Sequence, residues 1–502
     1  MTSPEPPSTD VNPVVRIGQG GLVGRTEAGI AAFKGVPYAA PPVGPLRWRE
    51  PQPPASWPGM RDAAAVGSIC VQPPAADDPG VGPLPMSEDC LSLNVWTPEP
   101  NGGPLPVMVW IHGGALFTGS GTAALYDGAA LARRGVVVVT INYRLGRLGF
   151  FAHPALSAEA GGKALVGNYG LADMVAGLEW VRDNISAFGG DPGNVTVFGE
   201  SAGGAAVLRL MIAEPARGLF HRAVVQSGLG RDEGTPVFQD RKGRSTLEDR
   251  GVAFAESLGL AGATVDQLRA VPAGRLLSPP PSFYGGDLLV IDAYDGGGLV
   301  GEDVESAFAA GIQAPVPLII GSNSDEFGGI RPGDMSPYRE VDAALTQAER
   351  EALQAAYGGV EGYDIGVVSD LAFNEPARRL ARLHARAGHP TWLYRFDVVA
   401  AAMPGAPSAA PHGSERPYVF DNLSAAGWPV GDRDRRAATL MADYWTGLAK
   451  TGDPNGDGRP VWPEYRAMPG QLLMFGNDGP VAGPVPDADR LDLIEAVYAR
   501  IR

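Results

Sequence analysis

Residues 194–211 read Asn-Val-Thr-Val-Phe-Gly-Glu-Ser-Ala-Gly-Gly-Ala-Ala-Val-Leu-Arg-Leu-Met, and this stretch decides the fold. The short β-branched and apolar run at 194–198 predicts a strand, and the Ala, Leu and Met residues of 202–212 favour a helix. Between them, the small residues around Ser201 allow a sharp turn without Cβ clashes. We therefore expect Ser201 on a strained strand-to-helix turn, beside the free amides and positive dipole end of the helix.

Strands and helices alternate on both sides of this turn. Further strands are expected at 107–111, 136–143, 222–226, 316–320 and 392–396, and helices at 171–185, 433–450 and 487–501. Such alternation predicts a mostly parallel central sheet with helices on both faces. The motif Gly199-Glu200-Ser201-Ala202-Gly203 between a strand and a helix is typical of the α/β-hydrolase fold, in which that serine is the nucleophile.

A glycine-rich segment follows the expected strand at 107–111. It reads His112-Gly113-Gly114-Ala115, and a serine nucleophile needs hydrogen-bond donors aimed at the oxyanion that develops during attack. The backbone amides of Gly114, Ala115 and Ala202 are the expected donors. The alternative is a simple glycine turn after a strand.

The general base is found by elimination among six histidines. In this fold the order along the chain is serine, acid, histidine. His412 lies in a loop just after the expected strand at 392–396, where a general base belongs. The others precede Ser201, follow it too closely, or sit in a helical stretch or before a proline: His112, His153, His221, His384 and His389.

The acid is expected just after the strand at 316–320. That strand runs into Gly-Ser-Asn-Ser-Asp-Glu at 321–326. Either Asp325 or Glu326 could orient the imidazole of His412 and stabilise its charged form. Spacing alone does not choose between them.

Several further motifs occur in a recognisable order along nearly the whole chain. They are Phe-Lys-Gly-Val-Pro-Tyr-Ala at 33–39 with 41–44 and 46–48, Ser-Glu-Asp-Cys-Leu at 87–91 with 93–96, and Phe-Gly-Gly-Asp-Pro at 188–192. Together with the serine motif they resemble the type-B carboxylesterases, which include cholinesterases and bacterial para-nitrobenzyl esterases. The resemblance implies that Glu326 is the acid and His412 the base. Glu200 resembles the family's buried carboxylate beside the serine, with Ser227 as its hydrogen-bond partner.

The chain has two cysteines, Cys70 and Cys90. A metal site would require further Cys or His residues nearby, so a disulfide that closes the loop fits the pair better. The resemblance implies the same disulfide. Such a bond would contribute about 3 kcal/mol and would suit an oxidising compartment. The resemblance also pairs Arg47 with Glu88 as a structural contact.

The chain departs from the family pattern at a few positions near the expected site. Ala115 stands where cholinesterases carry Gly, Leu116 replaces an aromatic residue, and Met174 occupies a place where Gln is frequent. These changes alter the shape of the pocket and leave the reaction type intact. The loop between the cysteines lacks the tryptophan that binds choline, so we expect no choline substrate.

Composition and charge restrict the partners. The chain has 502 residues, 44% of them hydrophobic, and a formal net charge of −16, which argues against binding to nucleic acid. No apolar run approaches the roughly 20 residues of a membrane helix, so no membrane partner is expected. We expect a loose tail over 1–12 and a single catalytic domain over 13–502, as a monomer or weak homodimer. The tail does not resemble a signal peptide, which favours the bacterial cytoplasm, although the cysteine pair would allow secretion.

A calcium loop is the one rival metal motif. Residues 453–458 with Glu464 formally match an EF-hand, but Pro460 and Pro463 fall inside it, so we read a turn and expect no metal and no cofactor.

The sequence therefore predicts a carboxylesterase that acts through a Ser-His-Glu triad and an acyl-enzyme on small to medium hydrophobic esters. One alternative is hydrolysis of amide or carbamate xenobiotics by the same triad. The other is a non-catalytic adhesion protein of this fold, which typically lacks a triad member. Insertions at 230–247, 279–294 and 330–338 are expected to cover the catalytic end of the sheet.

Overall fold

The structure is a computed structural model that describes residues 12–74, 84–161, 166–231, 245–277, 299, 303–328, 330, 336–403, 405 and 407–501. The expected tail, residues 1–12, lies outside the described residues except for Asn12. The expected insertion at 279–294 lies wholly outside them, and those at 230–247 and 330–338 lie partly outside.

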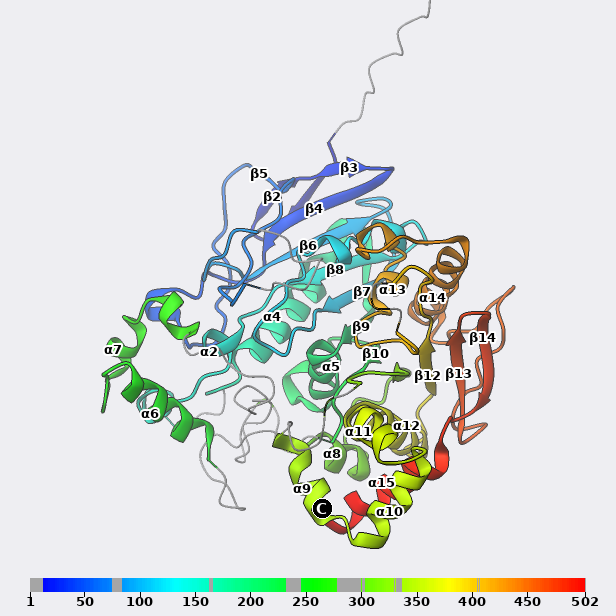
Figure 1. Cartoon of the computed structure of the whole chain (residues 1–502). Helices are drawn as coiled ribbons and strands as arrows, with labels where there is room; N and C mark the ends of the chain where they lie inside the picture. The colour runs from blue at the N-terminus through cyan, green and yellow to red at the C-terminus, as the bar shows by residue number, and fades with distance from the viewer. Residues whose placement is uncertain are drawn as a thin grey trace, which may run out of the picture.

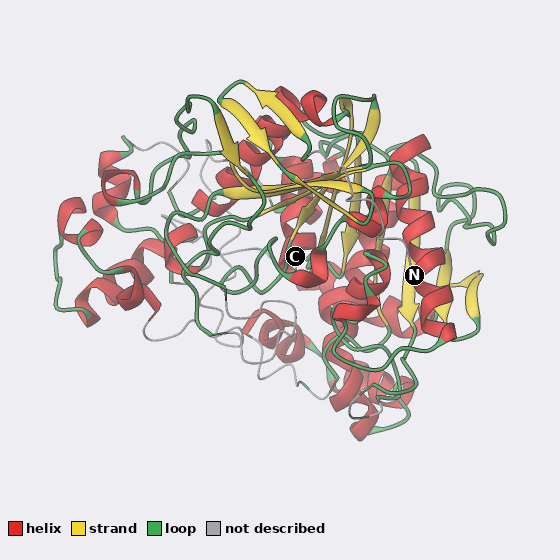
Figure 2. Cartoon of the chain, turned by 90° about the horizontal axis from the view of Figure 1, so that it is seen from above, coloured by secondary structure: helices red, strands yellow, loops and turns green. Residues whose placement is uncertain are grey.

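One large mixed sheet of 11 strands runs through the molecule (Figures 1 and 2). In spatial order its strands are β14 (Gly479–Pro484), β13 (Gln471–Gly476), β12 (Thr391–Asp397), β11 (Leu318–Asn323), β10 (Arg222–Gln226), β9 (Gly190–Glu200), β7 (Leu105–Ile111), β8 (Val137–Ile141), β6 (Ser92–Thr97), β4 (Ile30–Pro37) and β3 (Arg25–Glu27). The strands from β13 to β8 run parallel, and those beyond them at both edges pair antiparallel. The mostly parallel sheet predicted from the sequence is confirmed.

A second, small sheet and the helices complete the described part of the chain. The small sheet holds β1 (Val14–Ile17), β2 (Gly20–Val23) and β5 (Met60–Asp62). The helices are α1 (Ala129–Ala132), α2 (Gly146–Gly149), α3 (Pro154–Glu159), α4 (Tyr169–Asn184), α5 (Ala202–Ile212), α6 (Leu247–Ser257), α7 (Val265–Arg269), α8 (Val304–Ala310), α9 (Ser336–Ala344), α10 (Gln347–Ala356), α11 (Val360–Ser369), α12 (Glu375–Arg386), α13 (Arg416–Val419), α14 (Asp432–Thr451) and α15 (Ala488–Ile501). In the described residues, no helix has both the length and the apolar character needed to cross a membrane.

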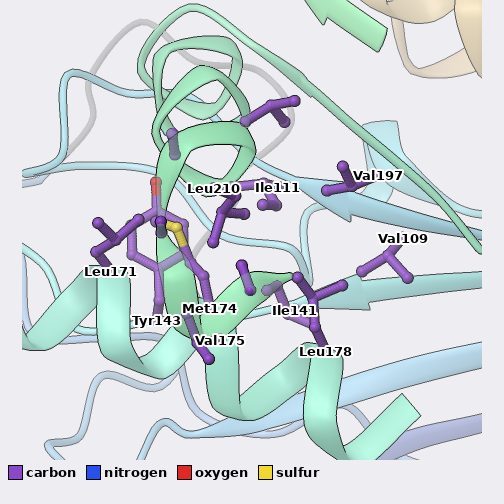
Figure 3. Packing of buried hydrophobic residues seen from close by; sticks show 14 of the residues in the cluster. Val109, Ile111, Ile141, Tyr143, Leu171, Met174, Val175, Leu178, Val197 and Leu210 are labelled. Carbon is purple, nitrogen blue, oxygen red and sulfur yellow. The ribbon is translucent and has the colours of Figure 1, made fainter. Parts of the chain in front are cut away.

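The central strands bury both of their faces. Successive side chains of a strand point to opposite faces, so Val109 and Ile111 of β7 pack in the core with α4 and α5. Figure 3 shows this core, with Leu171, Met174, Val175 and Leu178 of α4 against the strand residues. Trp110 of β7 packs in a second core on the other face, with Trp445 of α14. Helices therefore cover both faces, as the sequence predicts.

The order of the strands defines where a site forms. The chain leaves β7 toward β8 on one side and leaves β9 toward β10 on the other, so the loops after β7 and β9 diverge at the carboxyl ends of adjacent strands. In such sheets ligands bind at this kind of switch point. Ile111 pairs with Gly199, so the segments that begin at His112 and Glu200 start side by side.

The expected disulfide is not confirmed. Cys70 and Cys90 are both buried and free, and they lie 3.9 Å apart. The hydrogen bond with Cys70, together with burial, raises the pKa of the Cys90 thiol. The expected pair of Arg47 and Glu88 is present, with Nε–Oε2 and Nη2–Oε1 distances of 2.7 and 2.6 Å.

Residues 453–464 form a turn between α14 and β13. Asp453 Oδ1 accepts a hydrogen bond from the amide of Asn455 at 2.9 Å, and the Asn455 side chain bonds both the amide and the carbonyl of Trp462. These polar atoms are engaged with the chain itself, in agreement with the predicted turn.

Candidate active site

Ser201 sits on the tight turn between β9 and α5. Its φ of 56° and ψ of −123° lie in a region that non-glycine residues rarely adopt, and its amide donates to the carbonyl of Gln226 at 2.9 Å. The glycines of the motif are sterically required. A Cβ on Gly203 would lie 2.1 Å from the carbonyl oxygen of Ile111. The expected strained turn is therefore present, with α5 starting directly after the serine.

The structure brings Ser201, His412 and Glu326 together from three loops at the carboxyl ends of β9, β12 and β11. The Nε2 atom of His412 lies 2.8 Å from Ser201 Oγ, and its Nδ1 atom lies 2.5 Å from Glu326 Oε2. A backbone bridge between Asp325 and Pro411 joins the two loops that carry the acid and the histidine. Of the two candidate acids, Glu326 and not Asp325 contacts the imidazole.

The carboxylate of Glu326 is buried and firmly held. Its Oε1 atom accepts hydrogen bonds from the hydroxyl of Ser227 and the amide of Asn323, both at 2.6 Å. The single hydroxyl hydrogen of Ser227 thus goes to Glu326, whereas the resemblance pairs Ser227 with Glu200. Ser227 follows β10, which lies between the strands that end near Glu200 and Glu326, and the orientation of its side chain decides the partner.

Glu200 faces the opposite nitrogen of the imidazole. Its Oε1 atom lies 3.3 Å from His412 Nε2, and its Oε2 atom lies 4.0 Å from Arg416 Nε. Burial lowers the pKa of His412, but the charges of Glu200 and Glu326 and the hydrogen bond to Glu326 outweigh this and raise it to about 9. The site thus stabilises the imidazolium form.

A third buried carboxylate, that of Glu415, belongs to the same loop as His412. It accepts hydrogen bonds from Asn323 Nδ2 at 2.8 Å and from Gln226 Nε2 at 3.1 Å, and Trp445 Nε1 donates to Gln226 at 3.0 Å. Burial and the charges of Glu200 and Glu326 raise the pKa of Glu415 to about 7. Sequence reasoning gave this residue no role, although it stands three positions after His412.

Two aromatic rings flank the imidazole of His412. The ring of Phe327 lies 4.8 Å from it and that of Phe373 lies 5.2 Å from it, and the two phenyl rings meet edge to face at 5.0 Å. Phe373 belongs to a π-helical turn, Asp370–Asn374, between α11 and α12. Sequence reasoning missed both rings. Phe327 directly follows Glu326, which could have singled it out.

The loop after β7 lies against the serine turn. A Cβ on Gly113 would lie 3.1 Å from the Cβ of Ser201, so glycine allows the close approach. Gly114, Ala115 and Leu116 have φ values of 103°, 53° and 65°, three successive residues in the left-handed region. Among the backbone hydrogen bonds of the described residues, none uses the amide of Gly114 or Ala115 as donor. Ala202 is the first residue of α5, so its amide is also without an intrahelical acceptor.

The fold agrees with that of solved esterases. The structure of a thermophilic pNB esterase superposes with a TM-score of 0.82 and 34% sequence identity, covering 96% of this chain and 100% of that chain. The large sheet with the serine turn at the end of β9 is therefore an α/β-hydrolase fold.

Relatives and a family model cover nearly the whole chain. It is 38% identical to the fumonisin B1 esterase of Sphingopyxis macrogoltabida, 37% to the para-nitrobenzyl esterase of Bacillus subtilis (strain 168) and 35% to the phenmedipham hydrolase of Pseudarthrobacter oxydans. Each match spans 93% of this chain, and 87%, 95% and 96% of the relative. The model of the carboxylesterase family matches residues 11–361 and 365–486. The chain belongs to the carboxylesterase family and is a carboxylesterase.

Proposed function

We propose that the chain hydrolyses carboxylic esters through a triad of Ser201, His412 and Glu326 and an acyl-enzyme intermediate. The observation that carries this proposal is the hydrogen-bond chain from Ser201 Oγ to His412, at 2.8 Å, and from His412 to Glu326, at 2.5 Å. A nucleophile, a base and an orienting carboxylate within hydrogen-bond reach of one another are the arrangement that acyl transfer requires.

In the proposed reaction, His412 Nε2 takes the hydroxyl proton of Ser201 while Oγ attacks the ester carbonyl carbon. The resulting oxyanion accepts hydrogen bonds from the amides of Gly114, Ala115 and Ala202, and each such donor is worth about a hundredfold in rate or more. The carbon–oxygen bond to the alcohol then breaks, and the leaving oxygen receives the proton from His412.

A water molecule completes the proposed cycle. His412 takes a proton from the water as its oxygen attacks the acyl carbon, and the proton then passes to Ser201 Oγ as the acid leaves. The charges of Glu326 and Glu200 stabilise the imidazolium that forms in both halves of the reaction. These steps use side chains and amides of this chain and water alone.

The substrate class we propose is small to medium hydrophobic esters. Apolar groups surround the reacting atoms on two sides, the rings of Phe327 and Phe373 beside His412 and the side chain of Leu116 beside the loop amides. Such surroundings favour an uncharged, apolar substrate.

The test is hydrolysis of para-nitrophenyl esters of increasing acyl length by the wild type and by Ser201→Ala. We expect turnover by the wild type and a loss of about 10⁴-fold or more in the variant. Ser424→Ala, which changes an exposed serine, is the matched control and is expected to keep full activity. Substantial activity in a folded Ser201→Ala protein would overturn the proposal.

A second candidate, hydrolysis of amide or carbamate bonds by the same residues, is favoured by the relationship to a phenmedipham hydrolase. It needs expulsion of a poorer leaving group. Rates on para-nitroanilides and para-nitrophenyl esters of the same acid compare the two activities, and we expect the ester to be cleaved faster.

A further inference from the structure

One arginine lies beside the buried carboxylates of the candidate active site. The Nε atom of Arg416 lies 4.0 Å from Glu200 Oε2, and its side chain is 22% exposed, against 3% for that of Glu200. Burial and the charges of Glu200 and Glu326 raise the pKa of Glu415, whereas the charge of Arg416 acts to lower it. Arg416 therefore brings a positive charge to surroundings that are otherwise acidic.

Hydrogen bonds hold the guanidinium of Arg416 in this position. Its Nε atom donates to the carbonyl of Gly413 at 2.9 Å, and its Nη1 atom donates to the hydroxyl of Tyr126 at 3.0 Å. Tyr126 is buried, and its ring lies 4.9 Å from that of Trp110. A Cβ on Gly413 would lie 2.9 Å from the Nε atom, so the glycine after His412 allows the guanidinium to lie against this loop. The charge thus has a fixed place beside the loop of the general base.

Glu200 lies on the side of the site from which the alcohol leaves. In the proposed reaction, His412 Nε2 gives its proton to the leaving oxygen. Glu200 Oε1 lies 3.3 Å from that nitrogen, so the group attached to the leaving oxygen lies near this carboxylate. A buried carboxylate attracts a positively charged alcohol, because charges interact strongly away from bulk water. The charge of Arg416, which faces the other oxygen of the same carboxylate, opposes this attraction.

We propose that Arg416 determines the charge selectivity of the site for the leaving alcohol. Its charge offsets that of Glu200 and removes the preference for cationic alcohols that the buried carboxylates would otherwise create. The substrates that suit this arrangement are esters of uncharged alcohols. The missing tryptophan concerns a contact with choline, whereas Arg416 acts through its charge on any cationic alcohol. This inference rests on the proposed function, since it assumes that Ser201 and His412 cleave the ester.

The test compares two acetate esters that have nearly the same shape and differ in charge. They are 3-(trimethylammonio)phenyl acetate and 3-tert-butylphenyl acetate, in which a nitrogen cation replaces a carbon. Each kcat/KM is measured at about 10 mM salt, where screening is weak, and is divided by the rate constant for hydroxide-catalysed hydrolysis of the same ester. The charge ratio is the resulting value for the cationic ester over that for the neutral ester. We expect a charge ratio of about one for the wild type.

The variant Arg416→Met removes the charge and keeps much of the aliphatic side chain. Its charge ratio should be about tenfold higher than that of the wild type, because the charge of Glu200 is no longer offset. Arg416→Lys keeps the charge and is the matched control, with a charge ratio expected within about threefold of that of the wild type. Both esters carry the same acetyl group, so a change in folding or in the triad affects their rates alike and leaves the charge ratio unchanged.

The reciprocal variant is Glu200→Gln, which does not depend on the folding of an Arg416 variant. It removes the negative charge and leaves the positive one in place. The charge ratio should therefore fall about tenfold below that of the wild type. Opposite shifts in Arg416→Met and Glu200→Gln are what two mutually offsetting charges predict.

The outcomes separate the two proposals. If folded wild-type protein hydrolyses neither acetate and no para-nitrophenyl ester, the proposed function fails. If the wild type hydrolyses these esters, a wild-type charge ratio above about ten, or an Arg416→Met ratio within about threefold of the wild type, overturns the role of Arg416. An equal rise in Arg416→Lys overturns it as well, because the charge is then not the cause. If Arg416→Met does not fold, an unchanged charge ratio in Glu200→Gln overturns it. In each of these last cases the esterase mechanism stands.

Discussion

The two sides of Ser201 differ in chemical character, one being lined by buried charges and the other by apolar side chains. On the His412 side there are three buried carboxylates. Glu200 and Glu326 contact the imidazole, and the charge of Glu415 also raises its pKa. On the other side, the small cavity between α4 and α5 is apolar except for Asn168 and Arg209. Buried charge acts on every substrate, because it controls the protonation of one imidazole. The packed apolar side chains instead hold α4 and α5 in place around the turn of Ser201. Variants on the first side should therefore lower the rate for all esters, and variants on the second should lower the stability of the fold.

The largest effect is expected from Glu326→Gln. The amide cannot stabilise the imidazolium, and kcat should fall by about 10⁴-fold. Because the loss arises at His412, it should be the same for short and long acyl chains. The measurement is kcat across a series of para-nitrophenyl esters.

Asp325→Asn is the matched control for that prediction. Its backbone amide donates to Ala410 at 3.0 Å and its backbone bridges Pro411, but Glu326 supplies the carboxylate to His412. We expect less than a tenfold change in kcat. A larger loss in Asp325→Asn than in Glu326→Gln would mean that the acid has been misassigned.

The next largest effect is on stability and concerns the start of α4. Arg144 and Asp173 form a buried ion pair near the start of α4, with Nε–Oδ2 and Nη2–Oδ1 distances of 2.7 Å. Asp173→Asn leaves a buried guanidinium without its counter-charge, and the free energy of unfolding should fall by about 3–5 kcal/mol. Urea denaturation at neutral pH measures it.

The double variant Arg144→Met, Asp173→Leu sharpens this prediction. It removes both charges and should be more stable than Asp173→Asn alone. If the unfolding free energy of Asp173→Asn differs from that of the wild type by less than about 1 kcal/mol, the ion pair does not stabilise α4.

A smaller effect on stability is expected from Leu171→Ala. Leu171 is buried in the hydrophobic core, so its truncation leaves a cavity there. The free energy of unfolding should fall by about 2–4 kcal/mol, which urea denaturation measures. A variant as stable as the wild type would show that this side chain contributes little to the packing of α4.

The smallest expected effect is a shift of the pH profile in Glu200→Gln. His412 acts as a base only when neutral, so kcat/KM rises with pH through its pKa, which neighbouring charges raise to about 9. Removing the charge of Glu200 lowers that pKa, and the acidic limb should move to lower pH. A limb that stays in place would show that Glu200 does not act on His412 electrostatically.

Much of the fold could be predicted because local patterns agree with it. The expected helix at 202–212 and strand at 222–226 coincide with α5 and β10. In contrast, β9 begins at Gly190, four residues before the expected start. Gly190 pairs with Leu105 and the strand continues through Pro192, although Gly and Pro are poor strand formers. Tertiary pairing overrides the local preference there.

The site could be predicted as far as single residues but not as far as their contacts. Elimination among histidines leaves His412, which lies 2.8 Å from Ser201. The choice between Asp325 and Glu326 depends on a backbone bridge between distant loops, which spacing does not contain. The partner of Ser227 depends on the rotation of its side chain between two carboxylates on either side of β10. The structure gives Glu326 where the resemblance implies Glu200.

The most direct measurement is a pre-steady-state assay with para-nitrophenyl acetate, followed by mass spectrometry of the quenched protein. The mechanism predicts a rapid release of para-nitrophenol approaching one equivalent per chain when deacylation is the slower step, and an added acetyl group on the peptide that contains Ser201. Hydrolysis of the ester with the acyl group on a different residue would contradict the account.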